Sequence, residues 1–290
     1  MPLLLSPMNN VRFFFFLIWM SMAYAMPART TGPRAPIPAD SIVFKSGYVS
    51  VNGIRLFYQE AGEGDPILFL HGGFGTSEGQ FAAQFEHFFQ THRLITFDTR
   101  GHRRSEFDEK AFSYELFAAD TYQFLEALGI DRVSIIGFSD GGITGAILAG
   151  QHPEMVKHLV VIGANSVADT TAFFPADIAW VQNMNIQEMA EQIGSDWPEY
   201  PADKRVEFVK GMQKLWLEEP NLSEADLNRI SCPVLIVAGD SDSIKMEHQV
   251  YLYRHIPGSR LLILPNTGHD AHISRAGIVN PLIQELMEGS

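Results

Sequence analysis

Six short apolar runs, separated by segments with helical spacing or by glycine-rich turns, constrain the fold of this chain more than any other feature. Runs that are apolar at consecutive positions are typical of strands buried on both faces of a sheet. Strands that alternate with helices assemble into a mostly parallel sheet with helices on both sides. We therefore predict an α/β fold with a mostly parallel central sheet flanked by helices. The predicted strands are residues 66–70, 93–97, 133–137, 159–162, 234–238 and 261–264.

A hairpin and three helices are predicted around these strands. Asn52-Gly53 separates two alternating runs, residues 47–51 and 54–60, and this dipeptide favours a two-residue hairpin turn. Apolar side chains recur at helical spacing in three further segments. The predicted helices are residues 114–128, 140–150 and 281–287, the last with Asn280 as its N-cap and Pro281 at its first position.

Residues 165–230 interrupt this alternation, because they contain helical runs but no convincing strand. We predict that they form a helical cap inserted between two strands. Three of the four tryptophans of the chain lie in this segment. They either line a substrate pocket or pack the small core of the cap itself. The three tryptophans are Trp180, Trp197 and Trp216, and two further aromatic residues of the segment, Phe173 and Phe174, are also candidates for the pocket.

The first 25 residues have the three parts of a secretory signal peptide. Arg12 is followed by an apolar run over residues 13–20 and by the small-x-small ending of residues 23–25. The run is shorter than the roughly 20 residues that span a bilayer, and an uncleaved anchor is the alternative. We predict cleavage after Ala25 and a secreted or periplasmic protein. The predicted divisions are residues 1–25 as signal peptide, 26–42 as proline-rich linker and 43–290 as the folded domain.

Composition limits the partners and cofactors of the folded domain. Acidic residues outnumber basic residues by 34 to 21, for a net charge of −13, whereas nucleic-acid binding needs a basic face. The single cysteine, Cys232, excludes an intramolecular disulfide and a zinc site built on paired cysteines. We expect a small-molecule substrate, no metal or organic cofactor, and no stable membrane anchor after signal cleavage. The sequence does not indicate the oligomeric state.

Residues 137–142 carry the strongest signal for chemistry. They read Gly-Phe-Ser-Asp-Gly-Gly and lie between a predicted strand and a predicted helix. In this context a Gly-x-Ser-x-Gly turn lifts the serine hydroxyl above the sheet, at the N-terminus of the next helix. Ser139 is therefore the candidate nucleophile, and an ordinary glycine-rich turn is the alternative.

A serine nucleophile needs a base, and the base needs a carboxylate that orients it and stabilises its protonated form. His269 follows the last predicted strand, at the sheet edge where open α/β sheets place their sites. Asp242 follows the preceding strand and is the predicted partner of His269, with Asp240 in reserve. The order serine, acid, histidine along the chain is typical of one fold in particular.

Short motifs also follow four of the predicted strands. The carboxyl ends of parallel strands are where sites form in open α/β sheets. They are His71-Gly72-Gly73, Asp98-x-Arg100-Gly101-His102-x-Arg104-Ser105, Gly239-x-x-Asp242 and Gly268-His269.

Together with the serine turn, these motifs resemble those of the α/β-hydrolase superfamily over about residues 45–288. The resemblance implies an oxyanion hole made of two backbone N–H groups. One belongs to Asp140, the residue after the nucleophile, and the other to Gly73, with Phe74 as the next candidate. Arg103 departs from the family pattern, in which glycine is usual at this position.

Within the superfamily, the serine turn is most similar to that of the valacyclovirase (biphenyl hydrolase-like) group. There the aspartate after the nucleophile is tied to recognition of an α-ammonium group, a role that carries over to Asp140. The alternative is that Asp140 is an ordinary acid in the first turn of a helix, favoured by the helix dipole. The predicted substrate-binding residues are Phe74, Phe138, Asp140, Trp180 and Trp216.

The resemblance implies a serine hydrolase that cleaves carboxylic esters or lactones through an acyl-enzyme. Cofactor-free haloperoxidases or perhydrolases and carbon–carbon bond hydrolases share the fold and are alternatives, as is a non-catalytic receptor. Haloalkane dehalogenases and epoxide hydrolases of this fold need an aspartate nucleophile, whereas position 139 is a serine.

Overall fold

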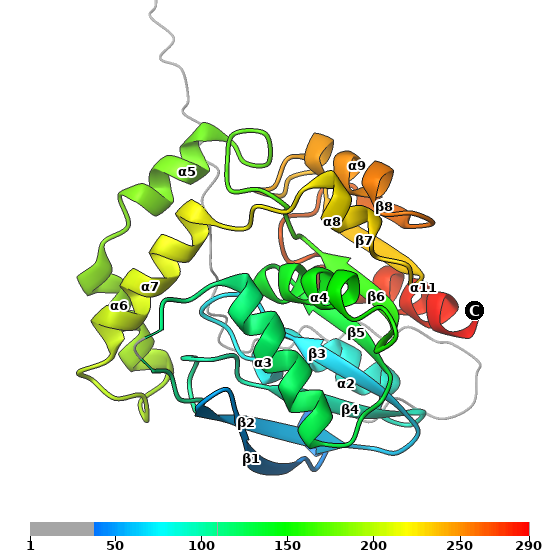
Figure 1. Cartoon of the computed structure of the whole chain (residues 1–290), viewed down its shortest axis with the longest axis horizontal. Coiled ribbons are helices and arrows are strands. Elements are labelled where there is room, and N and C mark those ends of the chain that lie inside the picture. Colours follow the sequence, from blue (N-terminus) through cyan, green and yellow to red (C-terminus); the bar gives the residue numbers. More distant parts are fainter. Residues whose placement is uncertain (1–37, 109, 290) are drawn as a thin grey trace, which may run out of the picture.

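An eight-stranded sheet forms the centre of the molecule (Figure 1). The computed structural model describes residues 38–108 and 110–289, so the predicted signal peptide and the linker up to residue 37 lie outside the described residues. The strand order is β1-β2-β4-β3-β5-β6-β7-β8. The strands are β1 (Lys45–Val51), β2 (Ile54–Ala61), β3 (Asp65–Leu70), β4 (His92–Phe97), β5 (Val133–Phe138), β6 (Val156–Ile162), β7 (Val234–Gly239) and β8 (Arg260–Leu264).

Six of the strands run parallel, as predicted for the six apolar runs, and each predicted run lies inside an observed strand. The hairpin of β1 and β2 adds two antiparallel strands at one edge. Its turn is the predicted one: Asn52 and Gly53 have φ angles of 44° and 87°, as a two-residue turn of this kind requires.

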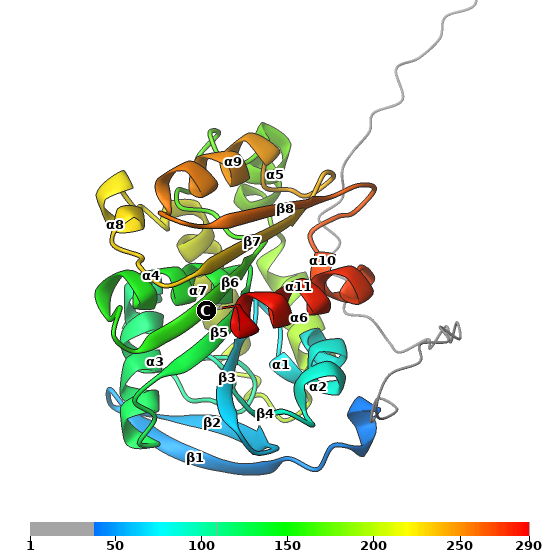
Figure 2. The same ribbon diagram turned by 90° about the vertical axis from the view of Figure 1, so that its right-hand side faces the viewer.

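Helices cover both faces of the sheet, and Figure 2 shows the two layers with the sheet between them. The helices α3, α4 and α9 pack on one face, whereas α2, α10 and α11 pack on the other. A short 3₁₀ helix, Ala39–Ser41, precedes the sheet. The α-helices are α1 (Ser77–Gln80), α2 (Ala82–Phe88), α3 (Tyr114–Ala127), α4 (Asp140–Gln151), α5 (Pro175–Gln182), α6 (Ile186–Asp196), α7 (Arg205–Glu218), α8 (Glu224–Asn228), α9 (Met246–His255), α10 (Ala271–Ser274) and α11 (Ala276–Glu288).

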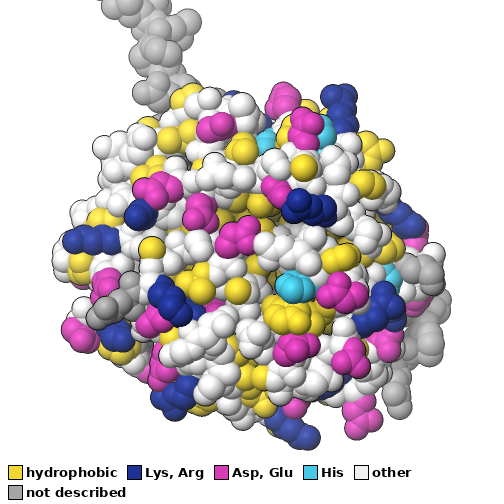
Figure 3. All heavy atoms as spheres, viewed as in Figure 1, with side chains coloured by type: hydrophobic (Ala, Val, Ile, Leu, Met, Phe, Trp, Pro, Cys, Tyr) yellow, Lys and Arg dark blue, Asp and Glu magenta, His cyan; other side chains and the backbone are white. Residues whose placement is uncertain are grey.

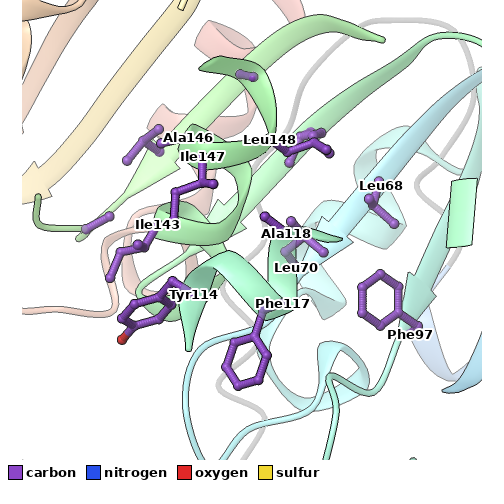
Figure 4. Packing of buried hydrophobic residues seen from close by; sticks show 14 of the residues in the cluster. Leu68, Leu70, Phe97, Tyr114, Phe117, Ala118, Ile143, Ala146, Ile147 and Leu148 are labelled. Atoms are coloured by element: carbon purple, nitrogen blue, oxygen red, sulfur yellow. The ribbon is translucent and has the colours of Figure 1, made fainter. Parts of the chain in front are cut away.

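The core consists of one apolar layer on each side of the sheet. Figure 4 shows the layer under α3 and α4, where Leu70 of β3 lies near Phe117 and Ala118 of α3 and Ile147 of α4. On the opposite face, phenylalanine side chains of α2 fill the corresponding position, with Phe69 packed edge-on against Phe85. The central strands therefore bury apolar side chains on both faces of the sheet. For this reason their sequences are apolar at consecutive positions.

The predicted N-cap of the last helix is wrong. The helix α11 begins at Ala276 and contains Pro281, rather than beginning at it. Asn280 lies inside the helix and is buried: its Nδ2 donates to the carbonyl oxygen of Ala83, and its Oδ1 accepts from Nε2 of Gln84. These bonds to α2 satisfy the amide, so a tertiary contact outweighs the capping preference of asparagine.

Along the chain, the helices α5, α6, α7 and α8 come between β6 and β7, as predicted for residues 165–230. The helix α7 packs against α5 and α6, and these three helices form the cap. The helix α8 instead packs against α4 and α9 and so belongs to the layer on the sheet. The cap is thus shorter than the predicted segment.

No helix in the two described ranges combines the length and the apolar character needed to cross a membrane. On the face shown in Figure 3, Lys and Arg side chains are scattered among Asp and Glu rather than gathered into a basic patch. The expected absence of nucleic-acid binding remains a prediction.

Candidate active site

Ser139 occupies a strained turn between β5 and α4. Its backbone has φ 52° and ψ −119°, a conformation that costs a side-chain-bearing residue about 1–3 kcal/mol. The flanking glycines are needed for space: a Cβ on Gly137 would lie 2.4 Å from the carbonyl oxygen of Gly141. A Cβ on Gly141 would lie 2.0 Å from the carbonyl oxygen of Leu70. The turn therefore has the predicted shape, with the serine at the start of α4.

The structure brings together the three residues predicted to act as nucleophile, base and orienting acid. The distance from Ser139 Oγ to His269 Nε2 is 3.1 Å, and the distance from His269 Nδ1 to Asp242 Oδ1 is 2.8 Å. Asp242 follows β7 and His269 follows β8, so both lie at the carboxyl edge of the sheet. This edge is where open α/β sheets hold their sites.

Asp242, rather than Asp240, contacts the histidine. The Asp242 side chain is fully buried, and its Oδ1 also accepts hydrogen bonds from the N–H of Ile244 and the hydroxyl of Ser243. Asp240 is exposed, and its Oδ1 accepts from the N–H of Thr267. Asp240 therefore stabilises the loop that carries His269 but does not contact the imidazole.

The surroundings of His269 favour its protonated form. Burial alone would lower its pKa, but the charge and hydrogen bond of Asp242 raise the pKa above the usual value, and the charge of Asp140 adds to this. Because a carboxylate only accepts, the Nδ1 proton of His269 points to Asp242. Nε2 of the neutral ring then faces the hydroxyl of Ser139 as an acceptor, which is the tautomer that a general base needs.

Gly163, at the end of β6, is a site residue that the sequence reasoning missed. Its φ is +55°, and a Cβ there would lie 2.9 Å from Nδ1 and Cε1 of His269 and 3.2 Å from Oδ2 of Asp242. Only glycine leaves room for the imidazole in its observed place. A signal was present, since Gly163 directly follows a buried strand at the edge that carries the site.

Asp140 is buried, and its carboxylate accepts hydrogen bonds from two neutral side chains. Its Oδ1 accepts from the hydroxyl of Tyr114 at 2.9 Å, and its Oδ2 accepts from Nε1 of Trp216 at 3.0 Å. Burial raises the pKa of the Asp140 carboxyl, and the two hydrogen bonds oppose that rise. Tyr114 comes from the start of α3 and Trp216 from α7 of the cap, so the carboxylate joins three helices.

The loop after β3 lies directly against the serine turn. A Cβ on Gly73 would lie 2.7 Å from Oδ2 of Asp140 and 2.4 Å from the indole of Trp216. Phe74 has a left-handed backbone, with φ 53°, and packs against Trp216 and Phe208. Gly73 therefore lies against the residue that follows Ser139, and its role as an oxyanion donor stays a prediction.

A cavity of about 620 Å³, open to solvent, lies over Ser139 and His269. Its lining includes three carboxylate residues: Asp140, Asp177 of α5, and Glu219 at the end of α7. Its lining contains no lysine or arginine. The remaining wall is mostly apolar, with Phe173, Ile178, Trp180, Val181 and Trp216 contributed by the cap and the loop before it.

The predicted pocket aromatics divide into two groups. Trp180, Trp216 and Phe173 line the cavity. The others lie outside its lining, because they pack elsewhere. Phe138 lies against His269 and His272, Phe74 under Trp216, Trp197 against Tyr200 and Phe208, and Phe174 beside Lys245.

No group of three or more His, Cys, Asp or Glu residues in the described ranges is placed to hold a metal ion. The chemistry that the geometry offers is nucleophilic attack by a serine beside a histidine and a carboxylate. The sheet order, the strained serine turn after β5 and the acid and histidine after β7 and β8 define a protein of the hydrolase type.

Comparison with known proteins agrees with this class. The family model of the alpha/beta hydrolase fold matches residues 65–193. Human serine hydrolase BPHL is 30% identical over 267 residues, which cover 88% of this chain and 91% of BPHL. The 3-oxoadipate enol-lactonase 2 of Acinetobacter baylyi is 24% identical and covers 83% of this chain and 96% of its own length. The chain therefore belongs to the α/β-hydrolase family.

A solved structure shows the same fold. The enol-lactonase of Burkholderia xenovorans LB400 is similar, with a TM-score of 0.68 at 20% sequence identity. The match covers 83% of this chain and 100% of the enol-lactonase chain. At this level of identity the similarity concerns the fold alone.

Proposed function

We propose that this chain is a serine hydrolase that cleaves carboxylic esters or lactones through an acyl-enzyme. The observation that carries the proposal is the continuous chain of contacts from Ser139 through His269 to the buried Asp242. A serine hydroxyl is a weak nucleophile until a positioned base takes its proton. The relatives named as a serine hydrolase and an enol-lactonase support the same class of reaction.

In the proposed mechanism, Ser139 attacks the substrate carbonyl while Nε2 of His269 removes the hydroxyl proton. Asp242 stabilises the imidazolium that forms and keeps the ring in the required tautomer. The imidazolium then donates its proton to the leaving alcohol. A water molecule, activated by the same histidine, releases the acyl group and regenerates Ser139.

The N–H groups of Gly73 and Asp140 are the proposed oxyanion donors. The N–H of Asp140 lies in the first turn of α4, where backbone donors have no partner within the helix. Among the described residues, no hydrogen bond engages the N–H of Gly73. We propose that both groups donate to the charge that develops on the carbonyl oxygen.

The cavity supports a small or medium, mainly apolar substrate. Trp180 and Trp216 give it two large apolar surfaces, and Phe173, Ile178 and Val181 add further apolar wall. We propose that these two cap residues contact the acyl or alcohol part of the ester.

The direct test is hydrolysis of p-nitrophenyl butyrate and of γ-butyrolactone by the wild-type protein and by Ser139→Ala. We expect hydrolysis of at least one substrate by the wild type and none above the blank by the variant. If Ser139→Ala matches the wild type, the proposal is wrong. If neither substrate is cleaved, hydrolysis of a vinylogous diketone and peracid formation from acetate and peroxide test the two rival chemistries.

The lining of the cavity favours a second candidate, an α-amino-acid ester. Asp140, Asp177 and Glu219 line a space that has no lysine or arginine in its wall, so a substrate ammonium would be attracted to it. The test compares kcat/KM for an α-aminoacyl ester and its des-amino analogue. A tenfold preference, about 1.4 kcal/mol, that Asp140→Asn removes would support this candidate. Equal rates would exclude it.

We also propose that residues 1–25 direct export and that residues 26–42 link the signal to the folded domain of residues 43–290. The support comes from the sequence alone, since residues 1–37 lie outside the described residues. N-terminal sequencing of the exported protein should begin at Met26. Retention of residues 1–25 in the mature protein would contradict the proposal.

A further inference from the structure

His71, the residue before the oxyanion loop, is buried and has both ring nitrogens in hydrogen bonds. Its side chain is 2% exposed. Nε2 lies 2.9 Å from the backbone nitrogen of Thr99, and Nδ1 lies 2.8 Å from the carbonyl oxygen of Gly72. The proposed mechanism gives this histidine no role, although it lies next to the loop that carries Gly73.

The two contacts require a single tautomer of the ring. A backbone N–H can only donate, so Nε2 of His71 must accept from Thr99 and carry no proton. A carbonyl oxygen can only accept, so Nδ1 must carry the proton and donate it to Gly72. Burial lowers the pKa of His71, which agrees with a neutral ring. The ring therefore connects the loop after β4 to the carbonyl group of Gly72.

That carbonyl belongs to the peptide whose N–H is the proposed oxyanion donor. A trans peptide unit is planar, with its C=O and N–H pointing in opposite directions. Fixing the carbonyl of Gly72 therefore fixes the direction of the N–H of Gly73. The N–H of Gly75 donates to the same oxygen at 3.1 Å, and the N–H of Gly72 donates to Oε1 of Gln80 at 2.8 Å.

The loop needs this support, because its backbone is strained. Phe74 lies in the left-handed region, which costs a side-chain-bearing residue roughly 1–2 kcal/mol. A flipped Gly72–Gly73 peptide would remove the carbonyl from both of its donors, on His71 and Gly75, and turn the N–H of Gly73 away from the site. The imidazole of His71 opposes that flip from a position that the substrate does not reach.

We propose that His71 is a positioning residue for the oxyanion hole, acting through the carbonyl oxygen of Gly72 to aim the N–H of Gly73 at the reacting carbonyl. The inference rests on the proposed function and deepens it. The two ring nitrogens of His71 then have separate roles. Nε2 joins the oxyanion loop to the loop after β4, and Nδ1 orients the N–H of Gly73 through the carbonyl of Gly72.

Two variants separate these tasks. In His71→Gln the longer amide reaches Thr99 and keeps an acceptor for its N–H, but the carbonyl of Gly72 loses its donor. In His71→Asn the shorter amide keeps an N–H near the position of Nδ1 and so keeps that donor. The substrate is p-nitrophenyl butyrate, and the midpoint of thermal unfolding monitors the fold.

We expect His71→Gln to lower kcat about tenfold or more with KM nearly unchanged, because the lost orientation acts on the transition state. His71→Asn should restore most of kcat. Wild-type kcat in His71→Gln would overturn the proposal, as would equal losses of kcat in both variants. If Ser139→Ala is as active as the wild type, the proposed function itself fails, which is a different result.

A measurement on the wild-type protein keeps the proposal testable if His71→Gln does not fold. The ¹⁵N shifts of the His71 ring, assigned by their loss in His71→Asn, report which nitrogen carries the proton. We expect a protonated Nδ1 and an unprotonated Nε2. A proton on Nε2 would overturn the proposal, since Nδ1 could then not donate to Gly72.

Discussion

The indole nitrogen of Trp216 lies 3.0 Å from Oδ2 of Asp140, so a cap helix is hydrogen-bonded to the residue that follows the candidate nucleophile. Tyr114 binds the other carboxylate oxygen, and its own backbone N–H donates to Glu219 at the end of the same cap helix. The carboxylate of Asp140 is thus held by the cap and by α3. This contact links the wall of the cavity to the first turn of α4.

The charge of Asp140 should affect the base at a distance. It contributes to raising the pKa of His269, although burial acts in the opposite direction. Because the base acts only when neutral, kcat/KM for an uncharged ester falls as the pH drops through the pKa of His269. Asp140→Asn should therefore lower that pKa and move the acidic limb of the pH profile to lower pH.

Asp177→Asn is the matched control for this prediction. Asp177 is a buried carboxylate in the wall of the same cavity, but it belongs to the cap rather than to the serine turn. We expect a smaller movement of the acidic limb in Asp177→Asn than in Asp140→Asn. An acidic limb that moves to higher pH in Asp140→Asn would contradict the electrostatic account.

Tyr114→Phe should destabilise the fold in a manner that depends on pH. The variant removes one donor from a buried carboxylate, a loss that typically costs about 1–3 kcal/mol. The loss also raises the pKa of Asp140 further, so the penalty is full at pH values above that pKa and shrinks as Asp140 becomes protonated. Chemical denaturation at neutral and at acidic pH measures this difference.

A double-mutant cycle provides the control for Tyr114→Phe. In the Asp140→Asn background the acceptor carries no charge, so Tyr114→Phe should cost less than it does in the wild type at neutral pH. Equal costs in the two backgrounds would mean that the hydroxyl of Tyr114 acts on something other than the carboxylate of Asp140.

Gly163→Ala should abolish most of the hydrolytic activity. The added methyl group would lie 2.9 Å from the ring of His269, and the imidazole would have to move away from Ser139. Gly258→Ala is the matched control, since Gly258 also has a positive φ, +69°, but has open space around the position of a Cβ. Both variants carry the strain of a left-handed alanine, about 1 kcal/mol.

The comparison therefore isolates the steric effect on His269. We expect near wild-type kcat in Gly258→Ala and a loss of at least tenfold in kcat in Gly163→Ala, as about 1.4 kcal/mol of lost transition-state stabilisation would give. Similar kcat values in both alanine variants would show that His269 tolerates the displacement.

Arg103→Gly should change the unfolding free energy by less than about 1 kcal/mol. Arg103 has φ 42°, so glycine would relieve backbone strain at this position. The variant would also lose two partly exposed ion pairs, to Glu78 at 2.5 Å and to Glu199 at 2.9 Å. These effects oppose each other. A loss well above 2 kcal/mol in denaturation experiments would mean that the ion pairs are stronger than their exposure suggests.

Local sequence patterns predicted the elements that place the site. Continuous apolar runs identify strands because both faces of the sheet are covered, and the strand ends then bring Ser139, Asp242 and His269 to one edge. The hairpin was predictable for the same reason, since Asn52 and Gly53 adopt left-handed backbones at little cost.

The partners of Asp140 could not be predicted in this way. Tyr114 and Trp216 meet it across 26 and 76 residues of chain, and such contacts depend on how the cap docks on the sheet. Asn280 shows the same limit, because its capping preference gave way to bonds with Ala83 and Gln84, far away in sequence.

The most direct test of the account is the location of the covalent adduct formed with a fluorophosphonate probe. Peptide mass spectrometry should find the label on Ser139, at a rate that Asp242→Asn reduces strongly because the imidazole loses its orienting carboxylate. Labelling of another residue, or the absence of labelling on a folded protein that still hydrolyses p-nitrophenyl butyrate, would contradict the assignment of Ser139 as the nucleophile.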